Sequence, residues 1–387
     1  MTVLDHQAVI AVDARKYGPQ DSGIGRYTAN LLSELLHKAG EEDFVGLIDP
    51  ENAAAGEILD SSRIRWVPVD APYHSLRAFW RLPKVLREQR ADLFHSHNYH
   101  VSPFLPCPLV LTVHDLTPLD YPSSRVAYFG KPLLRLLYKM AVAKAQRIIV
   151  PSQWTGLDLR SKLKVPEEII RVIPEGVDDR FRHRPDNSQI ARVRKTYRLP
   201  EQFLLYVGRW RPHKNIPIMV KAFQTIASQP IGKGLHLVVA GSYDRQRLDL
   251  FGGASPDIAG RICFTGFVFD EDLPAVYSLA TAVVAPSFAE GFGLTALEAM
   301  ACGTPVIAAN AGGLPEVCGN GALLVDPWSA TEMADAMGCL MADQALRIQL
   351  AEQGQAQAQQ FTWERTAHQT MRVYREVLST GARSGAN

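Results

Sequence analysis

The sequence predicts an α/β protein built from two doubly wound domains, each with a parallel sheet. Short apolar runs alternate with amphipathic segments along the chain, as strands and helices do when helices cover both faces of a parallel sheet. The chain has 387 residues, of which 47% are hydrophobic, so it is long enough for two domains with a core each. We place the first domain at residues 1–180 and the second at residues 190–361.

The first domain begins with a buried strand that runs into a helix start with two glycines. Strands are predicted at residues 8–15, 44–49, 63–69, 93–100, 109–115, 147–152 and 169–178. Residues 22–40 are predicted to be a loop that opens into an amphipathic helix, and 75–90 a helix. Gly23 and Gly25 lie in this loop, and a strand, a glycine loop and a helix in this order form a phosphate cradle. The glycines can instead mark only a tight turn, and Arg26 behind them is either a cation for the phosphate or a solvated side chain.

The second domain follows a polar stretch at residues 178–189, which has no periodicity and is predicted to be a linker. Apolar runs then indicate a second doubly wound sheet. Strands are predicted at the start of 203–215 and at 236–242, 262–268, 281–287, 305–310 and 322–327, and helices at 294–301 and 361–378.

The stretch at residues 286–305, PSFAEGFGLTALEAMACGTP, is the strongest candidate for a binding site. It joins a buried strand to a helix through Glu290 and a turn that contains Gly291 and Gly293. The first turn of a helix presents backbone N–H groups and the positive end of the helix dipole, and glycine lets an anion approach the backbone. We expect this turn to hold a phosphate or carboxylate group of a ligand.

Seven residues separate Glu290 from Glu298. If the segment were helical throughout, the two carboxylates would project from one side, about 12 Å apart. An acid and a base that act on one bond need roughly 5 to 10 Å, so this pair suits the two ends of one extended polar ligand. Alternatively, Glu290 only favours the helix N-terminus and Glu298 is solvated. Apolar neighbours on both sides of Glu298 argue against this, because a charge among them needs a partner.

A second candidate is the loop GRWRPHKN at residues 208–215, which follows a buried strand and opens a helix. Arginine binds phosphate oxygens in a bidentate way and lysine supplies a compact positive charge, so this loop has the composition of a diphosphate clamp. The alternative is a basic loop that is merely solvated. The basic side chains are Arg209, Arg211, His213 and Lys214.

Histidines lie at the ends of two predicted strands of the first domain. His95 and His97 belong to the strand at 93–100, and His114 belongs to the strand at 109–115. Ligands of doubly wound sheets bind beyond the carboxyl ends of the strands, which gives polar residues there a reason to be present. A metal pair at His95 and His97 is conceivable, but without a third ligand we interpret them as polar residues that line a cleft.

The composition limits the partners. Lys plus Arg total 41 against 40 acids, so nothing favours nucleic acid. No run of about 18 apolar residues occurs, and no basic segment precedes the first apolar run, so we expect a cytoplasmic protein. The five cysteines are odd in number and widely spaced, which is typical of reduced thiols. Asp270 and Asp272 superficially form a metal-binding D-x-D motif, but they begin a helix, where acids suit the N-terminus, so we expect no metal.

A basic stretch lies between Tyr121 and Leu157, where there is no Asp or Glu. A basic helix of this kind suits the anionic headgroups of a membrane surface, at about 1 kcal/mol for each well-placed cation. An ordinary helix with one apolar face and lysine stems along the other is the alternative. The cations are Arg125, Lys131, Arg135, Lys139, Lys144 and Arg147.

Three motifs resemble those of the retaining glycosyltransferases of family 4. E-G-F-G-L-T-A-L-E at 290–298, preceded by A-P-S and followed by A-M-A-C-G-T-P-V-I-A, is similar to the family's glutamate-seven-glutamate motif. G-R-W-R-P-H-K-N upstream and G-G-L-P-E-V at 312–317 occur in the family's order, so the resemblance is strong in the C-terminal half and looser in the N-terminal half. It implies a GT-B fold, with two Rossmann-like domains facing a central cleft and a C-terminal helix within 362–387 that packs back on the first domain.

The resemblance also implies a reaction and a set of residues. A nucleotide-diphosphate sugar would pass its sugar to an acceptor hydroxyl with retention and without a metal, the leaving phosphate accepting the proton. The implied catalytic residues are His114 and Glu290 on the sugar and Arg209 and Lys214 on the diphosphate. The implied donor contacts are Gly23, Gly25, Phe267, Val268, Gly291, Phe292, Gly293, Leu294, Thr295 and, on the ribose, Glu298.

The similarity in general appearance to bacterial surface-polysaccharide mannosyltransferases suggests GDP-mannose as the donor, with UDP-hexoses as the alternative. It also suggests a lipid-linked saccharide as the acceptor, which favours peripheral membrane contact by the basic stretch. Two other classes fit a diphosphate site between two such domains. A nucleotide-sugar epimerase would need no acceptor, and a non-catalytic sugar-nucleotide sensor would bind the donor without turnover.

Overall fold

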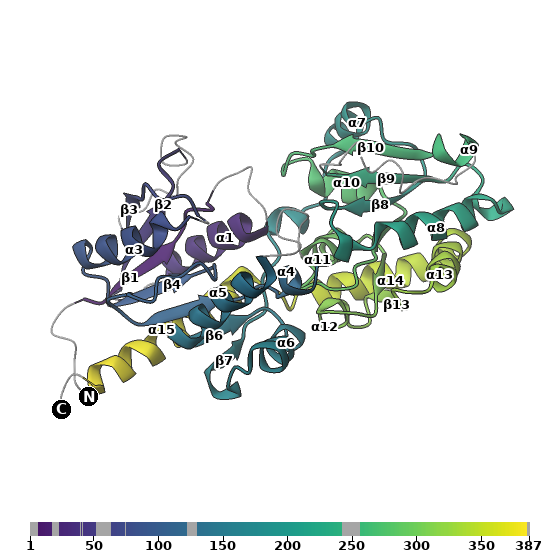
Figure 1. Ribbon diagram of the computed structural model, residues 1–387. Helices are drawn as coiled ribbons and strands as arrows, with labels where there is room; N and C mark the ends of the chain where they lie inside the picture. Colours follow the sequence, from purple (N-terminus) through teal and green to yellow (C-terminus); the bar gives the residue numbers. More distant parts are fainter. Residues whose placement is uncertain are drawn as a thin grey trace. The chain divides into compact units, whose positions relative to one another are not determined.

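The computed structural model describes residues 7–17, 23–38, 40, 42–51, 63–73, 75–121, 130–241 and 256–384. The chain divides into two compact units, Met1–Gly176 together with Thr362–Asn387, and Val177–Phe361. Both units are α/β structures with an all-parallel sheet, as the sequence predicts (Figure 1). No helix in the described part of the chain is both long and apolar enough to cross a membrane.

The first unit contains a seven-stranded sheet in the order β3-β2-β1-β4-β5-β6-β7. Its strands are β1 (Val9–Asp13), β2 (Asp43–Ile48), β3 (Ile64–Pro68), β4 (Leu93–Ser96), β5 (Leu109–Thr112), β6 (Ala145–Val150) and β7 (Ile170–Val172). Its helices are α1 (Gly23–Lys38), α3 (Arg77–Glu88), α4 (Thr117–Asp120), α5 (Gly130–Lys144), α6 (Gln153–Leu163), the short 3-10 helix η1 (Glu167–Ile169) and α15 (Trp363–Ser384).

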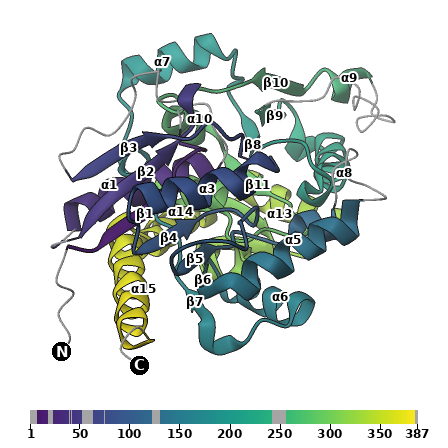
Figure 2. The ribbon, with the colours of Figure 1, turned by 60° about the vertical axis from the view of Figure 1, so that its left-hand side comes forward.

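Helices cover both faces of this sheet. Buried residues of α3, α5 and α6 pack on one face, against side chains such as Ala11 and Phe94. Buried residues of α1 and α15 pack on the other face, against Ile10 and Val12. This alternation along β1 is the period of two expected of a strand that is buried on both faces. Figure 2 shows α15, in yellow, against the sheet of the first unit although it is the last helix of the chain.

The second unit contains a six-stranded sheet in the order β10-β9-β8-β11-β12-β13. Its strands are β8 (Phe203–Val207), β9 (His236–Ala240), β10 (Ile262–Gly266), β11 (Ala282–Ala285), β12 (Val306–Ala309) and β13 (Ala322–Val325). Its helices are η2 (Asp179–Phe181), α7 (Asn187–Thr196), η3 (Pro212–Lys214), α8 (Ile216–Ala227), η4 (Pro230–Gly232), α9 (Pro256–Ala259), α10 (Leu273–Leu279), α11 (Leu294–Ala301), α12 (Leu314–Cys318), α13 (Ala330–Ala342) and α14 (Gln344–Ala358).

The stretch predicted as an irregular linker is partly helical. Asp178 accepts a hydrogen bond from the backbone N–H of Arg180 and starts η2, and Asp186 accepts one from Gln189 and starts α7. Aspartates at these positions satisfy backbone donors that a helix start leaves unpaired. Polar composition alone suggested a loop because capping residues and loop residues are the same types.

Candidate functional site

The two sheets each have one point at which the strand order reverses. In the second unit the chain runs outward from β8 to β10 and then returns to place β11 beside β8. In the first unit it runs outward from β1 to β3 and returns to place β4 beside β1. Ligands of such sheets bind beyond the carboxyl ends of the strands at these switch points. Lys214 and Glu290 follow β8 and β11 in the second unit, and His97 and His114 follow β4 and β5 in the first.

The basic loop and the glutamate turn meet at the switch point of the second unit. Lys214, at the end of η3, forms an ion pair with the carboxylate of Glu290, which follows β11. The hydroxyl of Ser287 donates a second hydrogen bond to the same carboxylate at 2.8 Å. Burial by itself would raise the pKa of Glu290, but Lys214 and Ser287 outweigh it and hold that pKa below its ordinary value. Glu290 is therefore a charged, oriented carboxylate at neutral pH.

Asn215 explains why the basic loop lies where it does. Its buried side-chain amide donates to the carbonyl oxygens of Pro286 at 3.0 Å and Pro327 at 2.7 Å. Asn215 also has a φ of +53°, a left-handed conformation that asparagine adopts more readily than most residues. One side chain thus ties together the loops that follow β8, β11 and β13. No local pattern around Asn215 in the sequence indicates these contacts.

Glycines allow the turn before α11 to pack closely. A Cβ on Gly293, whose φ is +113°, would lie 2.6 Å from Leu314 Cδ2. A Cβ on Gly312, whose φ is +65°, would lie 2.7 Å from both the backbone nitrogen and the oxygen of Glu290. The N–H of Gly313 donates to the carbonyl oxygen of Glu290 at 2.8 Å. The G-G-L-P-E-V motif is therefore a backbone support for the glutamate turn.

Glu298 has different surroundings from Glu290. It lies in α11, is only 2% exposed, and accepts a hydrogen bond from the hydroxyl of Tyr277 in α10 at 2.8 Å. Since α11 begins at Leu294, Glu298 lies in the helix and Glu290 lies before it. The separation expected for two carboxylates on one continuous helix therefore does not apply to this pair. Tyr277 is the partner that a charge among apolar neighbours requires.

The other donor-binding candidates of the second unit surround this turn or lie at the end of β10. Arg209 follows β8 with an exposed side chain, and its carbonyl oxygen accepts a hydrogen bond from Tyr206 at 3.2 Å. Phe267 is 54% exposed after β10, whereas Val268 is buried in the core. Gly291 and Phe292 are buried, and Leu294 and Thr295 form the half-buried first turn of α11.

The acidic run before α10 carries a structural network. Asp272 is buried, pairs with Arg192 at 2.5 Å and accepts a hydrogen bond from Tyr197 at 2.9 Å. Asp270 lies 3.8 Å from Arg180. These partners tie the start of α10 to η2 and α7. In the described residues, no three His, Cys, Asp or Glu side chains are grouped so that they could hold a metal ion.

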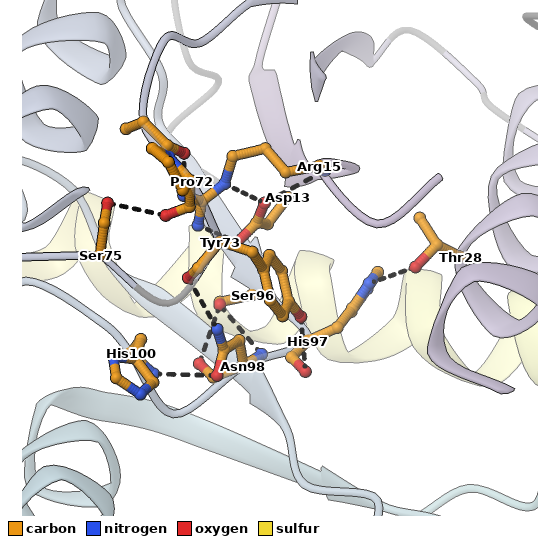
Figure 3. Close-up of polar contacts among 11 residues, drawn as sticks. Asp13, Arg15, Thr28, Pro72, Tyr73, Ser75, Ser96, His97, Asn98 and His100 are labelled. Atoms are coloured by element: carbon orange, nitrogen blue, oxygen red, sulfur yellow. Dashed lines mark hydrogen bonds and ion pairs between the residues drawn. The ribbon is translucent and has the colours of Figure 1, made fainter. Parts of the chain in front are cut away.

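Buried polar residues fill the switch point of the first unit (Figure 3). Arg15 makes a two-pronged ion pair with Asp13 at the end of β1, with both distances 2.8 Å, and donates to the carbonyl oxygen of Ala71. The Tyr73 ring lies 5.2 Å from the Arg15 guanidinium, and its hydroxyl donates to the carbonyl oxygen of His97. This network fixes the loops after β1, β3 and β4 relative to each other.

Two of the predicted histidines are buried in neutral form. His95 contacts Tyr374 Oη through Nδ1 at 2.6 Å and Thr112 Oγ1 through Nε2 at 2.8 Å, so it belongs to the core instead of lining a cleft. His97 contacts Thr28 Oγ1 through Nδ1 at 2.8 Å. Burial, together with His97 and His114, lowers the pKa of His95, and burial together with His114 lowers that of His97 to about 3.

His114, like His97, keeps its Nε2 without a hydrogen-bond partner among the described residues, but it differs from His97 in having a carboxylate at Nδ1. Its Nδ1 lies 2.9 Å from Glu175 Oε1, and its Nε2 is buried without a hydrogen-bond partner in the described part of the molecule. Glu175 follows β7 and is a residue that the sequence analysis missed. It lies inside a stretch read as part of a strand, and nothing local indicated that it meets a residue 61 positions away.

Gly23 and Gly25 lie in the first turn of α1, and a Cβ on Gly23 would have no atom within 4 Å. The loop that leads into them, 18–22, lies outside the described residues. So do residues 122–129, which include Arg125 of the basic stretch. The rest of that stretch forms α5 and β6, and Arg147 in β6 pairs with Glu376 of α15 at 2.7 Å.

Comparisons with known proteins match both halves of the chain. A family model described as Glycosyltransferase Family 4 matches residues 22–181, and one described as Glycosyl transferases group 1 matches residues 188–357. The O-antigen chain mannosyltransferase B of Escherichia coli is 28% identical over 92% of this chain and 96% of its own length. The D-inositol 3-phosphate glycosyltransferase of Acidothermus cellulolyticus is 32% identical over 74% of this chain and 68% of its own.

Among solved structures, the sucrose-phosphate synthase of Thermosynechococcus elongatus is similar over 97% of this chain and 100% of its own, with a TM-score of 0.76 and 26% identity. The likeness extends over both units and identifies the GT-B fold that the motifs predicted. Both sheets have polar residues at their switch points, the motifs occur in the family's order, and the relatives are glycosyltransferases. The chain is a glycosyltransferase and belongs to glycosyltransferase family 4.

Proposed function

We propose that this enzyme transfers a hexose, with retention, from a nucleotide-diphosphate sugar to a hydroxyl of a saccharide acceptor. The bond between the anomeric carbon and the diphosphate oxygen breaks, and the acceptor oxygen bonds to the same carbon from the same face. The acceptor proton passes to the leaving diphosphate. The observation that carries the proposal is the pairing of Lys214 with Glu290 at the glycine turn, which sets a cation and an oriented carboxylate side by side at the switch point.

Each residue has a defined part in this scheme. Lys214 and Arg209 stabilise the departing diphosphate together with the N-terminus of α11, which takes the place that a divalent cation has in other transferases. Glu290 exchanges part of its contact with Lys214 for the hydroxyls of the hexose. Glu298, oriented by Tyr277, holds the ribose, and His114 contacts the hexose. Phe267 and Val268 lie beside the base, and Gly23 and Gly25 lie near the phosphates.

We propose mannose as the hexose and GDP-mannose as the donor. The support is the likeness to the E. coli O-antigen chain mannosyltransferase B, which extends over almost the full length of both chains. By the same analogy the acceptor is a growing surface polysaccharide on a lipid carrier, at the inner face of the cell membrane. A UDP-hexose donor is the alternative.

A thermal-shift panel of GDP-, UDP-, ADP- and dTDP-sugars tests the donor. A ligand that binds only the folded protein raises stability by RT ln(1 + [L]/Kd), so GDP-mannose should give the largest rise in melting temperature. The rise should persist in EDTA, since no metal takes part. A larger rise with another sugar nucleotide would replace GDP-mannose, and loss of the rise in EDTA would overturn metal-independent binding.

An epimerase and a transferase can be distinguished by the products that each makes from the donor. An epimerase would convert GDP-mannose alone into a new sugar nucleotide, whereas the transferase needs an acceptor. Incubation of the donor with the enzyme, with and without bacterial membranes as a source of acceptor, distinguishes the two. Nuclear magnetic resonance of the anomeric proton of the product then reports retention or inversion.

We also propose that the first unit contacts an anionic membrane surface. Three cations and two leucines on α5 are exposed: Lys131, Leu133, Arg135, Leu136 and Lys139. On α3, which packs on the same face of the sheet, Trp80 is 71% exposed and stacks on Phe104 at a centroid distance of 5.4 Å. Exposed aromatic rings beside cations suit the interface of a bilayer with anionic headgroups.

A further inference from the structure

The carboxyl edge of the first sheet brings together an imidazole and a carboxylate that are distant in sequence. His114 follows β5 and Glu175 follows β7, with β6 between them. The distance from His114 Nδ1 to Glu175 Oε1 is 2.9 Å, and the Glu175 side chain is only 5% exposed. A nearly buried carboxylate needs a partner, and the imidazole N–H supplies a hydrogen bond to it.

Other contacts fix the orientation of the His114 ring. The Tyr27 ring meets it edge-on, with a centroid distance of 4.7 Å and an interplanar angle of 86°. The hydroxyl of Tyr27 lies 3.4 Å from Thr112 Oγ1, next to the strand end from which His114 follows. The backbone of His114 is held as well, since Thr155 Oγ1 donates to its carbonyl oxygen at 3.4 Å.

The opposite ring nitrogen has no such partner. His114 Nε2 is buried and makes no hydrogen bond to any residue that the structure describes. A buried polar atom left in this state costs about 1 to 3 kcal/mol. Proteins tolerate this cost where a ligand atom supplies the missing bond.

We propose that Glu175 is a positioning residue that fixes the tautomer of His114. A carboxylate can only accept, so the proton of the neutral ring must be on Nδ1. Nε2 then carries the lone pair and accepts a hydrogen bond from a hydroxyl of the bound hexose. This deepens the proposed function, on which it rests, by assigning Nε2 as an acceptor for a sugar hydroxyl and by naming the residue that makes it one. Carboxylates orient metal-bound and catalytic histidines in the same way.

The first test is spectroscopic and uses the full-length protein without donor. Long-range proton–nitrogen correlation spectra of protein labelled with ¹⁵N-histidine report which ring nitrogen is protonated, and the His114→Asn variant identifies the His114 signals. We expect the proton of the neutral ring on Nδ1 in the wild type and on Nε2 in a measurable fraction of Glu175→Gln molecules. The glutamine amide keeps the shape of the side chain and can donate as well as accept. A wild-type proton on Nε2 would overturn the proposal.

The second test is a double-mutant cycle in the transfer assay. Glu175→Gln should lower kcat about 10- to 100-fold, the range typical for residues that orient a functional histidine, with the KM for donor changed less than threefold. His114→Asn with Glu175→Gln should be no slower than His114→Asn alone, because the two side chains act as one unit. If the loss of kcat in the double variant equalled the product of the losses in the two single variants, the proposal would be overturned. If no transfer occurs in the wild type, the proposed function fails, while the tautomer is still decided by the spectra.

Discussion

The ammonium group of Lys214 pairs with the carboxylate of Glu290, a residue 76 positions later in the sequence. One partner arrives on the loop after β8 and the other on the turn after β11, two strands that lie side by side. Two motifs that are separate in the sequence are therefore parts of one charged pair. Under the proposed function, a bound diphosphate would give Lys214 a second anion to contact, so Glu290 and the ligand would share one cation.

Loss of Lys214 should affect the reaction far more than the fold. Lys214→Ala removes a cation from the departing diphosphate, so kcat/KM for GDP-mannose with membranes as acceptor should fall by about 2 to 4 kcal/mol of transition-state stabilisation, roughly 30- to 1,000-fold. The exposed Lys221 on α8 provides a matched control, and Lys221→Ala should stay within twofold of wild type. A kcat/KM for Lys214→Ala within a few fold of wild type would exclude its role.

Two substitutions of Asn215 distinguish the cost of its left-handed backbone from the stability that its side-chain hydrogen bonds provide. Asn215→Ala loses both buried bonds and keeps the left-handed φ of +53°, so unfolding should become about 2 to 4 kcal/mol easier. Asn215→Gly loses the same bonds but relieves the strain, so it should be about 1 kcal/mol more stable than the alanine variant. Urea denaturation measures both. Equal stability of the two variants would show that the conformation of residue 215 carries no cost.

Acid should destabilise the first unit through His97. The pKa of His97 is about 3 in the folded protein, against 6.5 for an exposed histidine. Between these two values the unfolded chain binds a proton at His97 and the folded chain does not. The stability this provides is complete above pH 6.5 and is lost as the pH falls below it. In His97→Asn the slope of unfolding free energy against pH, measured from pH 6 to 4, should be shallower by about 1.4 kcal/mol per unit. An unchanged slope would mean that His97 is protonated in the folded protein.

Flotation with vesicles tests the membrane surface. The wild type should float with vesicles that contain about a third anionic lipid and far less with neutral ones, because α5 contributes about 1 kcal/mol per cation. Trp80→Ser combined with Phe104→Ser should weaken flotation, and so should Lys131→Glu combined with Lys139→Glu. Leu157 on α6 is also exposed, and Leu157→Ser is the control that should float normally. Equal flotation with both kinds of vesicle would rule out an electrostatic contact.

The sequence predicted the parts of the fold and site that depend on local patterns. Apolar runs located the strands, and the family motifs located Lys214 and Glu290 because both are read within a few residues. The glycines at 312 and 313 were recognised as a motif, although their role in supporting the backbone of Glu290 needed the coordinates. The catalytic roles and all the donor contacts, including those at Phe267, Val268 and Glu298, are still predictions.

Partners that are distant in sequence escaped the sequence analysis. Tyr277 for Glu298, Glu175 for His114 and Tyr374 for His95 each come from another element, so no periodicity or spacing connects them. His95 was placed in a cleft because histidine at a strand end usually meets solvent or ligand. The structure buries it because Tyr374 and Thr112 satisfy both ring nitrogens. Residues 178–189 were predicted to be an irregular linker from their polar composition. Part of the stretch is helical, because the aspartates that cap helices are also common in loops.

The last helix of the chain completes the first unit. Trp363, Met371 and Tyr374 of α15 belong to the same apolar cluster as Ile10 and Leu31. A ribosome must therefore make all of Val177–Phe361 before it delivers α15, which covers this face of the N-terminal sheet together with α1. Until then, the apolar side chains of this face that contact α15 lack their cover, and His95 lacks its contact with Tyr374. During synthesis the second unit is the one that can reach its final state first, although it is encoded later.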